Sequence, residues 1–420
     1  MDVKILPSRL QGNITVPPSK SAAHRAIIAA ALAKGHSTIK NVDLSSDILA
    51  TIGACRSLGC TIHIGNSHKY RTLEIKGGLH ISGSANIDCA ESGSTLRFFI
   101  PIACALEGKK IFTGKGRLPK RPIDAYFDIF DKEGILYKKP ALSSLPLSVS
   151  GTLAGGDYVV EGSISSQYIT GLLLALPTLD KDTSIAVVNG FESKGYVDLT
   201  IRILQQFGID IVCSDSHYTI KGNQAYKPQN YTIEGDYSQA AFFIAGGALT
   251  GDICIDGLSR VSLQPDSAII DIMKRMGAKV DWDQSTLRVK KSYLTGIDID
   301  VSQCPDLVPP LAVAAAFADG KTRITGASRL RIKESDRLNA ISVNLNALGV
   351  KTQERPDGLI IQGAEIAQGD VSSFGDHRIA MAFSIAALRT QGGIRIKGAE
   401  CINKSYPGFL KDLASLGGRI

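Results

Sequence analysis

Long apolar stretches of helical length alternate with short β-rich segments along the whole chain. Six of these stretches end in a step to glycine and lead into a strand-like run, with a period of about 70 residues. Glycine just after the last helical position suits a left-handed cap, so each step predicts a helix end followed by a strand. The six steps are Leu58-Gly59, Glu133-Gly134, Phe207-Gly208, Met276-Gly277, Leu348-Gly349 and Leu416-Gly417.

A second type of helix is expected midway between these steps. It is rich in Ala, Leu, Ile and Phe on all sides, which is typical of a buried helix. Strand-like pieces that end in Gly or Asn, such as SIAVVNG and DICIDG, lie between the two helix types. The unit therefore contains helix, strand, helix, strand and strand, with a further strand leading into the next copy. The six buried helices are expected to start near Ser19, Gly93, Ser165, Tyr237, Pro305 and Gly375.

Six copies of one α/β unit in 420 residues predict two lobes of three copies each. The first lobe is expected at 19–234 and the second at 1–18 plus 235–420, with a hinge near 17–19 and 233–236. The sixth copy stops shortly after Gly417, so its strand pairing is incomplete. The strand-like runs Val3 to Leu6 and Asn13 to Val16 are expected to complete this last copy. A double connection of this kind fits closure of the lobes around a ligand.

Composition narrows the class of protein. Hydrophobic residues make up 44% and charged residues 21% of the chain, as in ordinary globular proteins. No apolar run approaches the roughly 20 residues that cross a bilayer, and the opening MDVKILPSRL lacks the apolar core of a secretory signal. The eight cysteines form no CxxC pair or Cys/His cluster. These features predict a cytoplasmic protein with no membrane span and no metal site.

The formal net charge of +7 is compatible with several anionic partners. A nucleic acid, a membrane surface and small acidic molecules would all be attracted by it. The chain has no run of Lys and Arg and no basic stripe interleaved with aromatic residues, which nucleic-acid binding favours. Small anionic substrates are therefore expected, and a nucleic-acid-binding protein stays as a weaker alternative.

Polar residues gather at the starts of the buried helices, where free N–H groups and the helix dipole favour anions. Any single one has a structural explanation, because Ser at a helix start is usually a cap and a Lys/Glu/Arg cluster is usually a solvated face. Their recurrence in five of the six repeats instead favours convergence on one cleft. The segments at the buried helices are PSKSAAHR, ESGSTLR, SSQ and GDHR, and the other helix class adds GRLPKRP, FESKGY, RIKESDR and NKSYP.

Two acidic or basic positions allow more than one interpretation. Asp306 opens an otherwise apolar helix, where it serves either as an N-terminal cap or as a desolvated general base beside cations. His377 could equally serve to orient hydrogen bonds or act as a catalyst.

Lys333 and Arg337 are four residues apart, so on a helix they share one face with Glu334 beside them.

The motifs PSKSAAHR, GRLPKRP, SISSQY, RIKESDR, GDHR and NKSYP together resemble the 3-phosphoshikimate 1-carboxyvinyltransferase (EPSP synthase) family over nearly the whole chain. The resemblance implies a two-lobed inside-out α/β barrel of six βαβαββ units. It also implies transfer of the enolpyruvyl group of phosphoenolpyruvate to the 5-hydroxyl of shikimate 3-phosphate, on the way to chorismate and the aromatic amino acids. No cofactor is expected, because phosphoenolpyruvate is a substrate, and the protein is expected to be a monomer.

The resemblance also assigns site residues. For the proton transfers, Asp306 is assigned to the hydroxyl proton, with Lys20 and Glu334 as candidates to deliver or remove the methylene proton. Shikimate 3-phosphate would be held by Lys20, Ser21, Arg25, Ser165, Ser166, Gln167, Ser193, Tyr196, Asp306 and Lys333. Phosphoenolpyruvate would be held by Lys20, Gly93, Arg121, Gln167, Arg337, Arg378 and Lys404.

Two positions depart from the pattern of the family. Glu91 and Arg329 each stand where the family commonly has Asn, and a carboxylate near bound phosphate would repel it unless Glu91 points away or pairs with a cation. The nearest rival is UDP-N-acetylglucosamine enolpyruvyl transferase, which usually has a reactive Cys in the loop that matches Gly114 to Pro122. That loop contains no Cys here. A catalytically silent anion-binding homologue is the other alternative.

Overall fold

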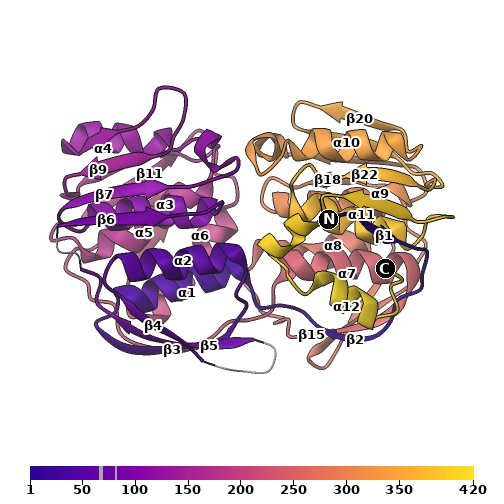
Figure 1. Cartoon of the computed structure of the whole chain (residues 1–420), viewed down its shortest axis with the longest axis horizontal. Helices are drawn as coiled ribbons and strands as arrows, with labels where there is room; N and C mark the ends of the chain where they lie inside the picture. The colour runs from indigo at the N-terminus through magenta and orange to yellow at the C-terminus, as the bar shows by residue number, and fades with distance from the viewer. Residues whose placement is uncertain (66–69, 81–82) are drawn as a thin grey trace. The chain divides into compact units, whose positions relative to one another are not determined.

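The computed structural model describes residues 1–65, 70–80 and 83–420, and these divide into two compact units (Figure 1). Residues Lys20–Ile233 form one unit, here called the N-terminal unit. Met1–Ser19 and Glu234–Ile420 form the other, the C-terminal unit. Each unit buries a hydrophobic core of its own.

Three buried helices run through each unit, as the apolar stretches predicted. In α7 and α11 every residue is buried, because their sequences offer apolar or small side chains on all sides. The N-terminal unit contains α1 (Lys20–Leu32), α3 (Gly93–Cys104) and α5 (Ser166–Ala175). The C-terminal unit contains α7 (Tyr237–Thr250), α9 (Val308–Ala316) and α11 (His377–Ala387).

The second class of helix ends where the glycine steps predicted. The glycine after each of these helices has a positive φ, between 68° at Gly134 and 95° at Gly417, so the left-handed cap is confirmed. These helices are α2 (Ser46–Ser57), α4 (Phe127–Glu133), α6 (Lys194–Gln206), α8 (Ile269–Arg275), α10 (Arg337–Ala347) and α12 (Phe409–Ser415).

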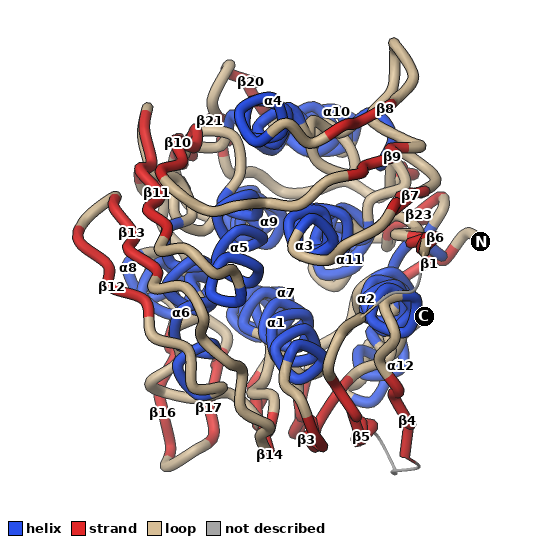
Figure 2. Tube along the Cα trace, turned by 90° about the vertical axis from the view of Figure 1, so that its left-hand side faces the viewer, coloured by secondary structure: helices blue, strands red, loops and turns tan. Residues whose placement is uncertain are grey.

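Strands of the described residues form six sheets, three in each unit. In the N-terminal unit, α1, α3 and α5 lie inside and the strands lie around them (Figure 2). The strand orders are β14-β3-β5-β4, β6-β7-β9-β8 and β10-β11-β13-β12. The strands are β3 (Gly35–Val42), β4 (Thr61–Gly65), β5 (Arg71–Gly77), β6 (Ser84–Asp88), β7 (Lys109–Thr113), β8 (Leu136–Lys138), β9 (Leu147–Ser150), β10 (Asp157–Glu161), β11 (Thr183–Val188), β12 (Ile211–Ser214), β13 (His217–Ile220) and β14 (Asn230–Thr232).

The C-terminal unit repeats this arrangement. Its strand orders are β16-β17-β15-β2, β18-β19-β21-β20 and β1-β23-β22. The strands are β1 (Val3–Ile5), β2 (Gln11–Thr15), β15 (Asp252–Asp256), β16 (Lys279–Asp283), β17 (Thr286–Lys290), β18 (Asp298–Asp300), β19 (Lys321–Thr325), β20 (Thr352–Arg355), β21 (Gly358–Gln362), β22 (Gly369–Ser372) and β23 (Ile394–Lys397). Short 3₁₀ turns complete the described elements: η1 (Leu118–Lys120), η2 (Asp124–Tyr126), η3 (Leu176–Thr178), η4 (Pro265–Ala268), η5 (Pro305–Leu307), η6 (Ser328–Ile332) and η7 (Ala399–Lys404).

One pairing scheme recurs in the sheets. In the second sheet of the N-terminal unit, β6 is parallel to β7, β7 is antiparallel to β9, and β9 is antiparallel to β8. The sheets built on β11, β15 and β19 have the same pattern of one parallel and two antiparallel pairings. The expected mixed α/β class and the sixfold repeat are therefore confirmed.

The start of the chain completes two sheets of the C-terminal unit. As expected, β1 pairs antiparallel with β23, and Leu6 forms a bridge with Arg419 in the last copy. The expectation for the second run was wrong, because β2 pairs in parallel with β15 of the fourth copy. The first copy of each unit needs a parallel edge strand that no preceding copy of that unit supplies. In the C-terminal unit β2 fills this place, and in the N-terminal unit β14 returns to pair with β3.

Candidate active site

The starts of α3 and α5 meet through one glutamine. Gln167 donates from Nε2 to Ser94 Oγ at 2.9 Å, and its Oε1 accepts from Arg97 Nη1 at 2.9 Å. Ser165 caps α5 by accepting from the Gln167 amide, and Ser166 beside it is buried. Gln167 is thereby held in one orientation, with its amide oxygen turned toward a buried guanidinium.

Arg25 of α1 is anchored among α1, α5 and α6. Its guanidinium donates to the Ser21 carbonyl, to Thr170 and Thr200 hydroxyls, and to the Tyr196 carbonyl. Burial lowers the pKa of Arg25 to about 10, so the group stays charged at neutral pH. Among the described residues its acceptors are neutral, so an anion that reached this guanidinium would meet an uncompensated positive charge.

Ser193 lies at the start of α6, where its backbone is strained. It precedes Lys194, the first residue of α6, with φ of 55° and ψ of 37°, and its side chain is buried. A serine in the left-handed region is uncommon and costs free energy. Tyr196, one turn further, is half-buried and gives its carbonyl to Arg25.

Lys20 and Asp47 form an ion pair at the start of α1. Lys20 Nζ lies 2.6 Å from Asp47 Oδ2, and both side chains are largely shielded from solvent. Asp47 belongs to α2 and also accepts at its backbone carbonyl from the Thr95 hydroxyl of α3. The position of the Lys20 ammonium is therefore set by two further helices.

A buried network of hydroxyl groups connects the same three helices. His24 Nδ1 lies 2.7 Å from Thr51 Oγ1, which in turn lies 2.8 Å from Thr95 Oγ1. Thr95 Oγ1 also lies 2.8 Å from the hydroxyl oxygen of Ser92, the cap of α3. Burial lowers the pKa of His24 to about 3, so this imidazole is neutral and structural.

The Arg121 guanidinium packs against the backbone of Gly93. A Cβ atom at position 93 would lie 2.5 Å from Arg121 Nη1 and 2.8 Å from its Cζ. Arg121 follows η1 and is buried. The missing side chain at position 93 therefore leaves the space that Arg121 occupies.

The two unusual residues have different surroundings. The Glu91 carboxylate lies against Gly116, because a Cβ atom there would be 2.8 Å from Glu91 Cδ. Glu91 thus packs on the same loop that carries Arg121. Arg329 is buried in η6 and donates from Nη2 to the Ser302 carbonyl at 2.7 Å, so it ties two loops together.

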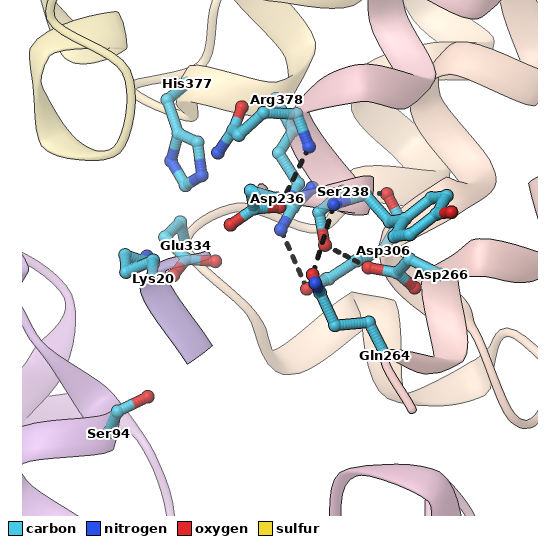
Figure 3. Close-up of polar contacts among 12 residues, drawn as sticks. Lys20, Ser94, Asp236, Ser238, Gln264, Asp266, Asp306, Glu334, His377 and Arg378 are labelled. Carbon is cyan, nitrogen blue, oxygen red and sulfur yellow. Dashed lines mark hydrogen bonds and ion pairs between the residues drawn. The ribbon is translucent and has the colours of Figure 1, made fainter. Parts of the chain in front are cut away.

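In the C-terminal unit, three carboxylates surround the Arg337 guanidinium. Nε donates to Asp376 at 2.7 Å, Nη1 to Asp306 at 2.9 Å and Nη2 to Glu334 at 2.8 Å. Arg337 begins α10, Asp306 lies in η5, and Asp376 caps α11. Figure 3 shows Asp306, Glu334 and Arg378 of this cluster.

Asp306 bridges two arginines. Its Oδ1 accepts from Arg337, and its Oδ2 accepts from Arg378 Nη2 at 2.9 Å. Burial raises the pKa of Asp306, but Arg378, Arg337 and Lys333 lower it more, and the net pKa lies well below the usual range. In this state Asp306 is an ionised, strongly stabilised carboxylate.

The remaining cations of the C-terminal unit lie close to these carboxylates. Lys404 at the end of η7 places its Nζ 3.9 Å from Glu334 Oε1. Lys333 follows η6, is half-buried, and acts on Asp306 through its charge. His377 is buried, with Nδ1 3.8 Å from Asp376 Oδ1. This cluster of described residues therefore contains four cations and three carboxylates, which lie in or beside η5, η6, α10, α11 and η7.

Three supporting residues had no role predicted from the sequence. Asp376 was grouped with the polar helix starts but was given no role, although it lies 70 residues after Asp306 in the repeat. That spacing was a usable signal. Asp47 and Arg97 were also given no role. Arg97 lies 70 residues before Gln167, which is again the repeat spacing, whereas no such spacing connects Asp47 to Lys20. Only the packing of α1, α2, α3 and α5 brings these side chains together.

Metal-binding clusters and membrane-spanning helices are both absent from the described residues. Among residues 1–65, 70–80 and 83–420, no group of three or more His, Cys, Asp or Glu side chains is arranged to hold a metal ion. Over the same residues, no helix is long and apolar enough to cross a membrane.

Buried guanidinium groups beside capped helix starts, on a repeated α/β fold, are typical of an enzyme that binds small phosphorylated or carboxylated substrates. The model of the EPSP synthase family, 3-phosphoshikimate 1-carboxyvinyltransferase, matches residues 6–413. The chain belongs to this family.

Relatives and solved structures agree with this membership. Over 421 residues the chain is 48% identical to the 3-phosphoshikimate 1-carboxyvinyltransferase of Clostridium acetobutylicum, covering 100% of this chain and 98% of that one. The enzyme of Clostridioides difficile is 46% identical over 432 residues, again covering 100% and 98%. The structure of EPSP synthase from Acinetobacter baumannii matches with a TM-score of 0.83 and 30% identity, covering 99% of this chain and 98% of that chain.

Proposed function

We propose that the chain transfers the enolpyruvyl group of phosphoenolpyruvate to the 5-hydroxyl of shikimate 3-phosphate, releasing phosphate. The observation that carries this proposal is the match to relatives named for that activity over the full chain. The buried arginines and capped helix starts of both units support it, because both substrates carry carboxylate and phosphate groups.

Shikimate 3-phosphate is proposed to bind through residues of both units. The start of α5 suits its phosphate, because Ser165 and Ser166 leave helix N–H groups and hydroxyls near a buried arginine. The Arg25 guanidinium supports this, since its acceptors among the described residues are neutral. The other proposed contacts are Lys20, Ser21, Gln167, Ser193, Tyr196, Asp306 and Lys333.

Phosphoenolpyruvate is proposed to bind the second set of cations. Arg337, Arg378 and Lys404 lie together in the C-terminal unit, where their charges can hold a carboxylate and a phosphate. In the N-terminal unit, Arg121 is fixed against Gly93 and Gln167 is fixed by Arg97. Lys20 completes the proposed set.

The chemistry requires addition followed by elimination. Asp306 is proposed to accept the proton of the 5-hydroxyl, whose oxygen forms a bond to C2 of phosphoenolpyruvate while C3 gains a proton. A base then removes a proton from C3, the carbon–carbon double bond forms again, and the bond from C2 to the phosphate oxygen breaks. The hydroxyl proton finally leaves with phosphate, so the proton count of the enzyme is restored.

Lys20 and Glu334 are proposed to handle the C3 proton. The ion pair with Asp47 fixes the position of the Lys20 ammonium, which suits proton delivery. Glu334 accepts from Arg337, which fixes the orientation of its carboxyl group for proton removal. Each transfer is worth about 10²–10⁴ in rate, and positioning by the cations adds to it.

The test is phosphate release by purified protein given shikimate 3-phosphate and phosphoenolpyruvate. UDP-N-acetylglucosamine replaces the shikimate ester in the control. Release with the shikimate ester alone is expected. Release with the nucleotide sugar alone would assign the chain to the rival activity. Release with neither would indicate a silent homologue, and Glu91→Asn would then be the first variant to examine.

We also propose that the chain acts as a monomer in the cytoplasm and that the connections near residues 17–19 and 233–236 serve as a hinge. A separate hydrophobic core in each unit supports the monomer, and passage of the chain between the units at only these two points supports the hinge. Light scattering would test the mass in solution. Small-angle scattering with both substrates would test closure, which is expected to lower the radius of gyration.

A further inference from the structure

Asp306 and Asp376 hold different sides of the Arg337 guanidinium. Asp376 accepts from Nε at 2.7 Å and from Nη2 at 3.4 Å, and its side chain is fully buried. Asp306 accepts from Nη1, and its side chain keeps 23% of its accessible surface. Asp376 is therefore a fixed anchor inside the C-terminal unit, while Asp306 can exchange with solutes.

The second oxygen of Asp306 faces another guanidinium. Arg378 Nη2 donates to Oδ2 at 2.9 Å, so one carboxylate spans two arginines with one oxygen on each. Carboxylate and phosphate ligands bind arginines through the same kind of charged N–H···O contact. The outer N–H groups of both arginines are thus occupied by an anion that belongs to the protein.

We propose that Asp306 occupies, without substrate, the place of an anionic group of phosphoenolpyruvate on Arg337 and Arg378, and that the bound substrate displaces it. This inference rests on the proposed function, because it takes the two arginines as binding groups for that substrate. Phosphoenolpyruvate has enough carboxylate and phosphate oxygens to accept from both. Asp376 keeps Arg337 in place while the exchange occurs.

The exchange changes Asp306 from a weak base into a stronger one. With both guanidinium groups on it, the pKa of its carboxyl is held well below the usual range. A carboxylate stabilised in this way attracts a proton poorly. Once the substrate accepts the two N–H groups, that stabilisation is lost and the pKa of Asp306 rises. The base therefore becomes effective only when the second substrate is bound.

Two variants of equal charge test the exchange. Asp306→Asn and Asp376→Asn each remove one negative charge from the same cluster, so a general electrostatic effect would tighten phosphoenolpyruvate binding in both. The exchange instead predicts opposite signs. Asp306→Asn is expected to bind about tenfold more tightly, or about 1.4 kcal/mol, because a competitor is gone. Asp376→Asn is expected to bind about tenfold more weakly, because Arg337 loses its anchor.

The measurement is calorimetric titration of the full chain with phosphoenolpyruvate alone, and thermal melts check that each variant is folded. Asp306→Ala provides a second variant that cannot keep the contacts through an amide. Unchanged or weaker binding in the folded Asp306 variants would overturn the exchange, as would tighter binding in the Asp376 variant. If the wild type released no phosphate from the two substrates, the proposed function itself would fail. If the wild type turned over normally and the Asp306 variants gained no affinity for phosphoenolpyruvate, only the exchange would be overturned.

Discussion

At the start of α3, the guanidinium of Arg121 fills the space that a side chain at Gly93 would need. Gly93→Ala is expected to push Arg121 aside, because its flexible end is the group that would be contacted. A displaced cation weakens binding of its anion, so the KM for phosphoenolpyruvate should rise about tenfold. Steady-state kinetics with varied phosphoenolpyruvate measures this change.

Gly53→Ala is the matched control for this variant. Gly53 lies within α2, and a Cβ atom there would meet nothing within 4 Å. Alanine should raise the free energy of unfolding by up to about 1 kcal/mol there, through helix propensity, without altering the KM. An equal rise in KM in both variants would contradict the role given to Arg121.

His24 makes stability depend on pH. Its pKa is lowered from 6.5 to about 3 by burial, so between these values the unfolded chain binds a proton that the folded chain does not. The contribution of His24 to the free energy of unfolding is fully present above about pH 6.5 and is lost as the pH falls toward 3. Between pH 7 and pH 5 the loss should be about 2 kcal/mol.

Urea unfolding at pH 7 and pH 5 measures this effect. His24→Gln should reduce the difference in unfolding free energy between the two pH values by that amount, although it lowers stability at both. Ile28→Val in the same helix gives a control, since it removes no titratable group and should leave the difference unchanged. An unchanged difference in His24→Gln would show that the imidazole is protonated in the folded state.

At the scale of elements, the two units begin their buried helices with different caps. Ser92 and Ser165 cap α3 and α5 in the N-terminal unit, whereas Asp236 and Asp376 cap α7 and α11 in the C-terminal unit. Asp306 follows the same 70-residue spacing. Neutral caps leave a helix start able to attract a phosphate, but an aspartate cap supplies the negative charge itself. In the C-terminal unit anions must therefore be bound by arginine and lysine side chains.

The loop from Gly114 to Pro122 adds exposed positive charge near Arg121. Lys115, Arg117 and Lys120 are exposed, and within the described part of the chain their side chains form no hydrogen bond or ion pair. Such charges raise the local concentration of anionic substrates by about 10-fold or more at low salt. Replacing all three with Gln should lower kcat/KM for phosphoenolpyruvate about tenfold at low ionic strength and leave kcat unchanged.

Salt dependence gives the measurement for this loop. The difference from wild type should disappear near 1 M salt, where the screening length is about 3 Å. A charge-matched control replaces Lys274, Lys279 and Lys290 of α8, β16 and β17. If the control lost as much kcat/KM, the effect would come from net charge and not from the loop.

At the scale of the molecule, the two separate cores predict that each unit unfolds by itself. The single tryptophan, Trp282, lies in β16 and reports the C-terminal unit. Ile5 and Ile27 are both fully buried, in the C-terminal and N-terminal cores respectively. Ile5→Ala should lower the denaturant midpoint of Trp282 fluorescence, at a cost of about 2–5 kcal/mol. Ile27→Ala should leave that midpoint unchanged. It should instead lower the denaturant midpoint of the part of the circular dichroism signal that comes from the N-terminal unit. Equal shifts of Trp282 fluorescence would show that the units unfold together.

The repeat made much of this fold predictable. Apolar residues on all sides of α7, and glycine after α6, specify a buried helix and a left-handed cap through local chemistry alone. The pairing of Gln11–Thr15 was not predictable in this way, because a strand-like run does not reveal which edge it joins. Which sheet lacks an edge strand depends on the order in which all copies pack.

By itself, the sequence determined the six helix–strand units, their boundaries and the kinds of side chain at each helix start, because these follow from hydrophobic periodicity and backbone preference over a few residues. The tertiary structure alone decided which partners those side chains have. Asp376 meets Arg337 across 39 positions, and Arg25 meets Thr200 across 175. Contacts over such separations exist only after the core has formed, and their electrostatic strength depends on the burial that the core provides.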